Sequence, residues 1–356
     1  MAFNLQPCRS LIPALKDVFP AKMFYTYKCA SFMDSLVVQQ VLDKLDLRSK
    51  YQPGKVDIID CAPGYGLFSF MLNQELKPRN HILIEDKRRI VKSLTDVIDG
   101  LESRGCNTNM KLVTDTAYSW DVYNKIIDED KLIQPTKQPY DKVHDELLVV
   151  ANWSDETNES IIAQWIKCCG DRNWLMRYGK VRMILFTPLV TTQKFVALPG
   201  FLRRKRTGMK VSMFTDTKVM AITEPRTERH RDFDPRVMVR DQPVLLPKDC
   251  GGPNRDFAII EMMPGKYTND VIDDIEPYLL YLFWNQKQQL RERLSTMAPG
   301  ASYLLKLLPD SILDKYPPDL VGEDLIELNK AYLKWPFRPS FEEMAQEAYL
   351  TVDDHV

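Results

Sequence analysis

The sequence predicts an α/β fold: a doubly wound, mostly parallel sheet of the Rossmann-like kind, followed by a small C-terminal helical domain. Strand-like apolar runs alternate with helical patterns between about residues 34 and 263, which is typical of doubly wound sheets. These runs are almost continuously apolar, as in strands that helices cover on both faces. Beyond Pro264 the strand-like runs stop and helical spacing remains.

The first predicted domain, residues 1–264, begins with a helical pattern and continues with strands. The helix is expected at Asp34–Leu45, and helical runs such as Ser160–Cys169 separate the first five strands from one another. Strands joined by such crossovers run parallel. The predicted strands are Val56–Cys61, His81–Glu85, Met110–Thr114, Glu146–Ala151, Val181–Phe186, Thr217–Thr223 and Phe257–Met262.

The second predicted domain, residues 265–356, is helical. Apolar residues recur at helical spacing in 270–297, 302–309, 324–335 and 340–350, and the last residues form an acidic, polar tail. Such a tail is usually a solvated terminus.

Composition limits the function classes. The 356 residues are 44% apolar and 27% charged with a net charge of -1, so nucleic-acid binding would need a local basic patch. The seven cysteines include no CxxC pair and the four histidines are scattered, which argues against a metal site and a disulfide framework. The chain has no apolar run near the ~18 residues of a membrane span.

Candidate site residues follow the ends of four successive strands. These are Gly64 and Gly66 after the first strand, Glu85 and Asp115 after the next two, and Asn152 after the fourth. Ligands of open parallel sheets bind beyond these carboxyl ends. The glycines would let the backbone approach an adenosine-type ligand, with Glu85 at the ribose, Asp115 at the adenine amino group and Asn152 at the reacting centre. Singly, each has an ordinary alternative as a turn or a helix cap.

The motifs around these residues carry a family resemblance. "DCAPGYG", "LIEDKRR", "TDT" and "AN" follow one another as in the ribosomal RNA adenine N6-dimethyltransferases, which the chain therefore resembles. The resemblance implies an S-adenosylmethionine-methyltransferase fold. It also places Phe32, within "SFMD", in a cofactor-contacting segment, and matches "ALPG" at Ala197–Gly200.

Two departures from that family argue against catalysis. The family follows its Asn with an apolar residue, Pro and an aromatic ring, whereas this chain has "NWSD", with Asp155 at the ring position. An acid cannot sandwich a flipped base, and Trp153 is displaced by two positions. Ala62 replaces the first glycine of the turn. We therefore expect no catalytic residues, no required cofactor, and weak or absent S-adenosylmethionine binding.

A closer resemblance rests on "NWLMRYGKVRMILFTP" (Asn173–Pro188) and "KWPFRP" (Lys334–Pro339), which look like segments of the fungal mitochondrial transcription factor B family. The similarity runs from about residue 12 to residue 341. It implies a monomeric initiation factor of the mitochondrial matrix that acts without a membrane. Its partners would be the single-subunit mitochondrial RNA polymerase, which the acidic tail would contact, and promoter DNA, including the melted strand.

One basic run is the predicted nucleic-acid contact. Arg203, Arg204, Lys205 and Arg206 are four adjacent cations, and Lys210 follows without an intervening acid. Such a run can neutralise several phosphates independently of sequence, although a solvated basic loop has the same composition. A stretch at 226–240 mixes arginines with acids and is expected to be a surface insertion.

Two other functions stay open. Glu85, Asp115 and Asn152 also fit an active ribosomal RNA adenine dimethyltransferase, in which Asn152 would hold the target amino group. A non-catalytic RNA-binding assembly factor would differ from an initiation factor by preferring structured RNA to promoter bubbles.

Overall fold

A computed structural model describes residues 17–20, 28–106, 108–227, 232–273, 275–336 and 338–340. Its centre is one eight-stranded sheet in the order β3-β2-β1-β4-β5-β8-β6-β7. All seven predicted strands are present, and the eighth, β7, has only three residues and no clear sequence signal. The bounds are β1 Asp57–Cys61, β2 Asn80–Ile84, β3 Met110–Val113, β4 Val143–Asn152, β5 Lys180–Pro188, β6 Thr215–Thr223, β7 Val244–Leu246 and β8 Phe257–Pro264.

The sheet is mostly parallel, as predicted. In β1, Ile58 lies opposite His81 of β2 on one side and Leu148 of β4 on the other, with all three strands running in the same direction. Strand β8 is antiparallel to both neighbours, β5 and β6. The carboxyl ends of β1 to β7 therefore share one edge of the sheet, whereas β8 ends at the opposite edge.

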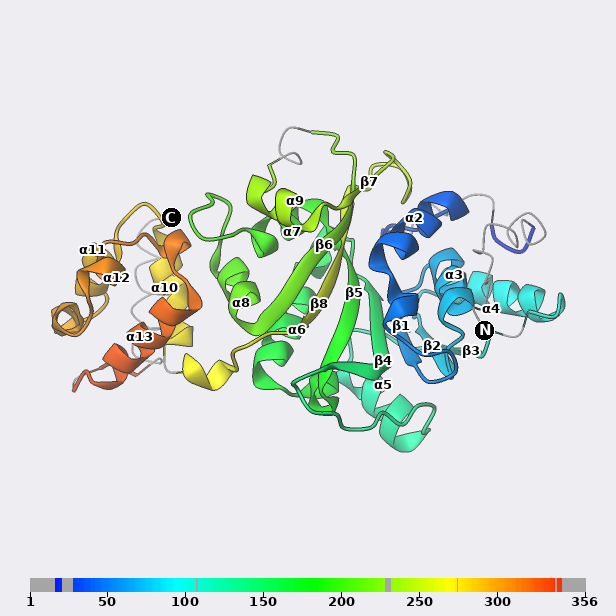
Figure 1. Cartoon of the computed structure of the whole chain (residues 1–356), viewed down its shortest axis with the longest axis horizontal. Coiled ribbons are helices and arrows are strands. Elements are labelled where there is room, and N and C mark those ends of the chain that lie inside the picture. Colours follow the sequence, from blue (N-terminus) through cyan, green and yellow to red (C-terminus); the bar gives the residue numbers. More distant parts are fainter. Residues whose placement is uncertain are drawn as a thin grey trace.

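Helices cover both faces of the sheet (Figure 1). Along β4, Leu147 and Val149 belong to one buried cluster and Leu148 and Val150 to the other, because successive strand residues point to opposite faces. The helices α2, α3 and α4 pack on the second cluster. The bounds are α2 Ser35–Leu45, α3 Leu67–Leu76, α4 Arg88–Glu102, α5 Trp120–Asn124, α6 Glu159–Asp171, α7 Leu189–Val196, α8 Arg206–Phe214 and α9 Pro235–Asp241.

The part after β8 contains only helices among its described residues. These are α10 Leu279–Trp284, α11 Leu290–Ser295, α12 Asp310–Leu313 and α13 Gly322–Leu333, with short 3-10 turns such as Pro317–Asp319. Leu279 and Leu325 belong to the same buried cluster as Val219 of β6, so the helical part shares one continuous core with the sheet. The acidic tail and Phe337 lie outside the described residues.

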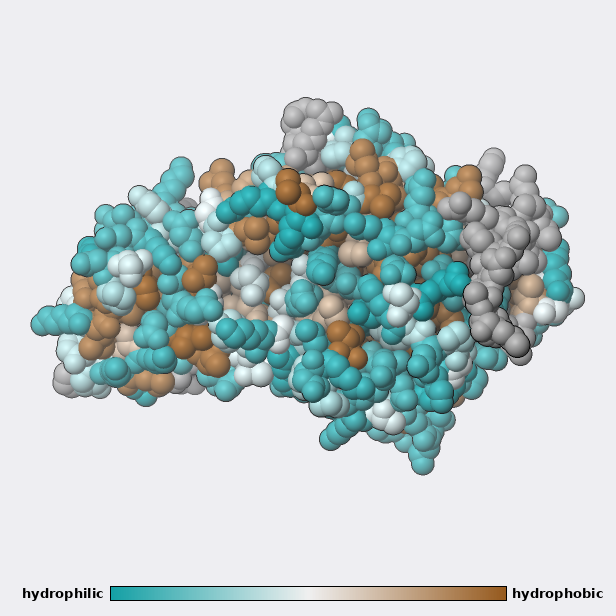
Figure 2. Space-filling model, viewed as in Figure 1, coloured by the Kyte–Doolittle hydropathy of each residue, from teal (hydrophilic) through white to brown (hydrophobic). Residues whose placement is uncertain are grey.

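Within the described residues, no helix is long and apolar enough to cross a membrane, and no group of three potential ligand side chains could hold a metal ion. Six described cysteines are free thiols. Figure 2 shows a largely hydrophilic surface, with apolar residues gathered over the C-terminal helices at the left of the view.

Candidate functional site

The glycine turn forms where it was predicted. Strand β1 ends at Cys61, and Ala62, Gly64 and Gly66 follow with φ angles of 53°, 63° and 81°. Glycine adopts these left-handed angles without cost, whereas alanine does so only under strain. A Cβ at Gly66 would meet Leu94 Cδ2 at 2.9 Å, so this position requires glycine for space as well. The methyl group of Ala62 is buried in the core.

Asn152 holds a segment of its own chain rather than facing open space. Its Nδ2 donates to the carbonyl of Ala30 at 2.6 Å, and its Oδ1 accepts from Ser154 Oγ at 2.7 Å. The amide of Ala30 donates to the same Ser154 oxygen at 2.6 Å, and the amide of Ser31 donates to the Gly251 carbonyl at 2.9 Å. The segment preceding α2 is thereby fixed across the carboxyl ends of the strands.

Four phenylalanine rings fill the space below this segment. Phe32 lies 5.7 Å from the ring centroids of both Phe186 and Phe257 and 6.2 Å from that of Phe68. Phe32 is only 3% exposed. The cavity between Phe32, the glycine turn and Asn152 measures about 20 Å³, about enough for one water molecule. Ligand pockets usually measure roughly 300–1,000 Å³, so this cavity is far smaller than a typical cofactor site.

Glu85 and Asp115 lie at neighbouring strand ends. The amides of both residues donate to the carbonyl of Val113, at 3.2 and 3.1 Å. Glu85 Oε1 accepts from the amides of Asp86 and Lys87, whereas the buried Oε2 has no partner. Burial raises the pKa of Glu85. Asp115 is only half-buried, and its Oδ1 accepts from the amide of Thr116. Among the predicted cofactor residues, Glu85 is therefore the one that is buried and has a carboxylate oxygen without a hydrogen-bond partner.

The segment after Asn152 contains no accessible stacking ring. Trp153 is 1% exposed and packs against Tyr118 and Trp165 at centroid distances of 4.9 and 5.5 Å. Asp155 caps the next turn by accepting from the amide of Thr157 at 2.9 Å. Trp153 thus belongs to the core and cannot stack on a base.

Two exposed aromatic side chains lie on top of this core at the same edge. Tyr118 is 44% exposed and Trp120 is 38% exposed. Tyr118 is held by its contact with Trp153 and by its hydroxyl, which donates to Asn158 Oδ1 at 2.5 Å. Trp120 packs edge-on against Trp174, 5.3 Å away. This pair was not predicted, since two aromatics in a loop after a strand give no periodic signal.

Exposed cations also occur at this edge of the sheet. Arg88 and Arg89, at the start of α4, are exposed, and neither forms an ion pair with any acid in the described ranges. Burial, followed by the neighbouring Cys29 thiol, raises the pKa of Tyr118 to about 12, with Asp86 also contributing. The aromatic pair and these cations therefore share only the carboxyl edge of the sheet, where β2 and β3 end.

The predicted basic run is largely used inside the protein. Arg204 is completely buried, and its Nη1 donates to the carbonyls of Pro318 and Leu320 at 2.8 and 2.5 Å, while Nη2 donates to Ser212 Oγ at 3.0 Å. Arg204 therefore joins the sheet domain to the helical part and cannot contact a phosphate. A run of four cations is normally solvated; here one of them satisfies helix-end carbonyls.

The rest of the run is divided between pairing and exposure. Lys210 is mostly buried and pairs with Glu276. Like Arg204, it is therefore not the phosphate contact that was predicted. Arg203 pairs with Asp232. Lys205 donates to Gln286 Oε1 at 2.7 Å, and Arg206 opens α8 half-exposed. For Arg203, Lys205 and Arg206 the phosphate role stays a prediction.

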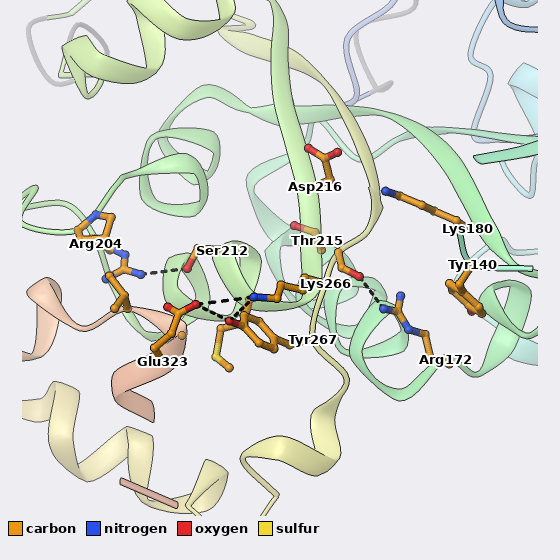
Figure 3. A pocket seen from close by; sticks show the side chains of 15 residues that line it. Tyr140, Arg172, Lys180, Arg204, Ser212, Thr215, Asp216, Lys266, Tyr267 and Glu323 are labelled. Carbon is orange, nitrogen blue, oxygen red and sulfur yellow. Dashed lines mark hydrogen bonds and ion pairs between the residues drawn. The ribbon is translucent and has the colours of Figure 1, made fainter. Parts of the chain in front are cut away.

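A groove of about 710 Å³ lies at the opposite edge of the sheet, between the sheet and the helical part (Figure 3). Arg172 stacks on the ring of Tyr140 at 4.4 Å and donates to the Gly265 carbonyl at 2.6 Å. Across the groove, Lys266 and Glu323 both contact Tyr267 (Figure 3). Four cations line the groove, against two acids, so its charge is positive on balance: Arg172, Lys180, Arg204 and Lys266 face Asp216 and Glu323.

The family model of the ribosomal RNA adenine dimethylases matches residues 23–319. The chain belongs to this family. Among solved structures, a dimethyladenosine transferase from Plasmodium falciparum is similar with a TM-score of 0.54 and 14% identity, over 84% of this chain and 98% of that one. That likeness supports the methyltransferase-type fold of this dimethylase-family chain.

Curated relatives carry a different name from the family. The chain is 30% identical to mitochondrial transcription factor 1 of Saccharomyces cerevisiae over 92% of this chain and 94% of that protein. It is 27% identical to the protein of the same name from Lachancea kluyveri, over 92% and 95%. This confirms the predicted relation to both groups: a dimethylase-family chain related to mitochondrial transcription factors.

Proposed function

We propose that this protein is a mitochondrial transcription initiation factor without methyltransferase activity. It would act in the matrix, bind the single-subunit mitochondrial RNA polymerase as a monomer, and help to open promoter DNA. The observation that carries the proposal lies at the carboxyl edge of the sheet. There the family's pocket is filled by the chain's own residues, while Tyr118 and Trp120 are exposed at the same edge of the sheet.

The arrangement suits a melted strand better than a flipped, reacting base. Unpaired bases stack on exposed aromatic rings, whatever their sequence, and nearby cations attract the backbone. Tyr118 and Trp120 supply the rings, and Arg88 and Arg89 supply charges that no described acid neutralises. Rings that hold unstacked bases would stabilise the open promoter over the closed duplex.

Run-off transcription with the mitochondrial polymerase tests this proposal. On a linear duplex promoter, we expect initiation to depend on the added protein and to fall about tenfold or more in the Tyr118→Ala, Trp120→Ala double variant. This corresponds to the loss of one stacked base, about 1–3 kcal/mol. Tyr303→Ala is the matched control, because Tyr303 is 39% exposed on the helical part. A pre-melted promoter should rescue most of the defect.

Absence of stimulation on the duplex promoter by the unaltered protein would overturn the proposal. A double variant as active as the control would remove Tyr118 and Trp120 from the DNA-binding surface. Competition between a promoter bubble and a structured ribosomal RNA hairpin separates the initiation factor from an RNA assembly factor, which would prefer the hairpin.

We also propose that no cofactor is required and that S-adenosylmethionine binds weakly or not at all. Asn152 is already engaged by Ala30 and Ser154, and Phe32 fills the space below them. Methyl transfer from labelled S-adenosylmethionine to a small-subunit ribosomal RNA hairpin should therefore stay at background. Robust turnover would establish the dimethyltransferase function instead.

A further inference from the structure

Trp284 is an exposed tryptophan that the core does not need. It ends α10 and is 69% exposed, whereas Leu279 and Leu282 of the same helix are fully buried. Tryptophan is mostly buried in folded proteins. Because α10 already packs through its leucines, the exposed indole at its end is available to bind a partner.

A second exposed apolar side chain stands on a neighbouring segment. Leu202, in the loop between α7 and α8, is 78% exposed. Gln286, two residues beyond Trp284, ties this loop to the end of α10. Its Nε2 donates to the Arg204 carbonyl at 3.3 Å, and its Oε1 accepts from Lys205 Nζ at 2.7 Å. The loop and α10 also lie side by side in Figure 1.

The surrounding charge is positive. Lys205, Arg206 and Lys287 form no ion pair with any acid in the part of the chain that the structure describes. The hydrogen bond of Lys205 goes to a neutral amide, so its charge is not compensated. The nearby acids Asp232 and Glu276 are already paired, with Arg203 and Lys210.

We propose that this surface, formed by Trp284, Leu202, Lys205, Arg206 and Lys287, binds single-stranded DNA. A base would stack on the indole and the three cations would hold the adjoining phosphates, the combination typical of single-strand sites. Protein interfaces are depleted in lysine, whereas two of the three free cations here are lysines. A base inside a duplex presents no free face to the indole, which favours the single strand.

This inference rests on the proposed function and extends it from the sheet edge to the helical part. The melted strand would have two contact areas, at Tyr118 and Trp120 and at Trp284. The aromatic residue of the second area lies outside the family's pocket, on the helix that follows the sheet.

The test is fluorescence anisotropy of a labelled single-stranded oligonucleotide with the full chain, over a range of salt concentrations. We expect Trp284→Ala to weaken binding about tenfold, equivalent to about 1.4 kcal/mol, and Trp284→Phe to retain most of the affinity. The triple variant Lys205→Gln, Arg206→Gln, Lys287→Gln should lower the slope of log affinity against log salt by about 2, at about 0.7 per contact. Leu333→Ala, an exposed apolar residue of α13, is the control.

Unchanged affinity and unchanged salt slope in these variants would overturn the inference. If Trp284→Ala instead weakens capture of the polymerase alone, the surface is a protein contact and the DNA site is wrong. If the unaltered protein binds the oligonucleotide through Trp284 but does not stimulate transcription, the proposed function fails while this site stands. Circular dichroism melting of each variant checks that its fold is intact.

Discussion

The pocket beside Asn152 and the junction around Arg204 both use ligand-type residues to hold the fold, but with different forces. The pocket is closed by neutral hydrogen bonds from Asn152 and by packed rings around Phe32. The junction is closed by a guanidinium that donates to the carbonyls of Pro318 and Leu320. One region buries apolar surface, and the other buries a charge.

The two regions should therefore lose stability for different reasons when a side chain is replaced. Burial lowers the pKa of Arg204 to about 10, so the side chain remains charged at neutral pH and depends on its carbonyl partners. Removing one member of a buried charged network leaves the others unsatisfied. In the pocket, truncation leaves an apolar void instead. Four predictions, in order of expected size, test this contrast.

The largest loss of stability is expected in the pocket beside Asn152, which is closed by apolar packing. Phe32→Ala should lower the free energy of unfolding by about 4 kcal/mol, since it removes a buried ring and leaves a cavity. Urea unfolding measures it, with Met33→Ala as control because Met33 is 37% exposed. Equal stability of the two variants would mean that the segment before α2 does not pack as described.

Arg204→Met tests the junction, which is closed by a buried charge. It keeps an unbranched side chain but leaves the carbonyls of Pro318 and Leu320 without their donor, at an expected cost of about 3 kcal/mol. Arg206→Ala, two residues away and half-exposed, should cost about 0.5 kcal/mol. The same urea titration compares them. If instead Arg204→Met keeps full stability and loses DNA affinity, its guanidinium is a phosphate contact and not an internal tie.

Asn152→Ala distinguishes a structural from a catalytic asparagine. The change removes the hydrogen bonds to Ala30 and Ser154, which should cost about 2 kcal/mol. Stimulation of run-off transcription at a temperature where the variant is folded should be unchanged. A loss of stimulation with full stability would give Asn152 a direct role in function.

The smallest change is expected for Glu85→Gln, and it is stabilising. The raised pKa of Glu85 means that the folded state disfavours its charged form, so the charge costs stability above the unfolded-state pKa. Removing it should stabilise the protein by about 1 kcal/mol at pH 7. Thermal melting between pH 4 and pH 7 checks this: the gain should shrink as pH falls, because wild-type Glu85 then becomes protonated. A gain independent of pH would rule out the charge as its cause.

Local patterns predicted much of the architecture. The seven strands were found because each is a continuous apolar run, and the turn after β1 because Gly64 and Gly66 mark left-handed backbone. Strand β7 was missed because three residues, Val244–Leu246, make too short a run. The aromatic pair Tyr118 and Trp120 was missed because exposure of a side chain in a loop has no sequence signal.

The sequence by itself determined the strands, the turn and the loss of the base-stacking ring at Asp155, since each depends on residue type and near neighbours. Tertiary structure alone decided which polar and aromatic groups face solvent. Arg204 and Arg206 are indistinguishable in the run, yet one is buried against helix-end carbonyls and the other opens α8. Trp153 and Trp284 are likewise the same residue with opposite exposures. The physical reason is that burial depends on which distant segment packs over a residue, and hydrogen-bond partners more than a hundred positions away, such as Pro318 for Arg204, leave no local trace.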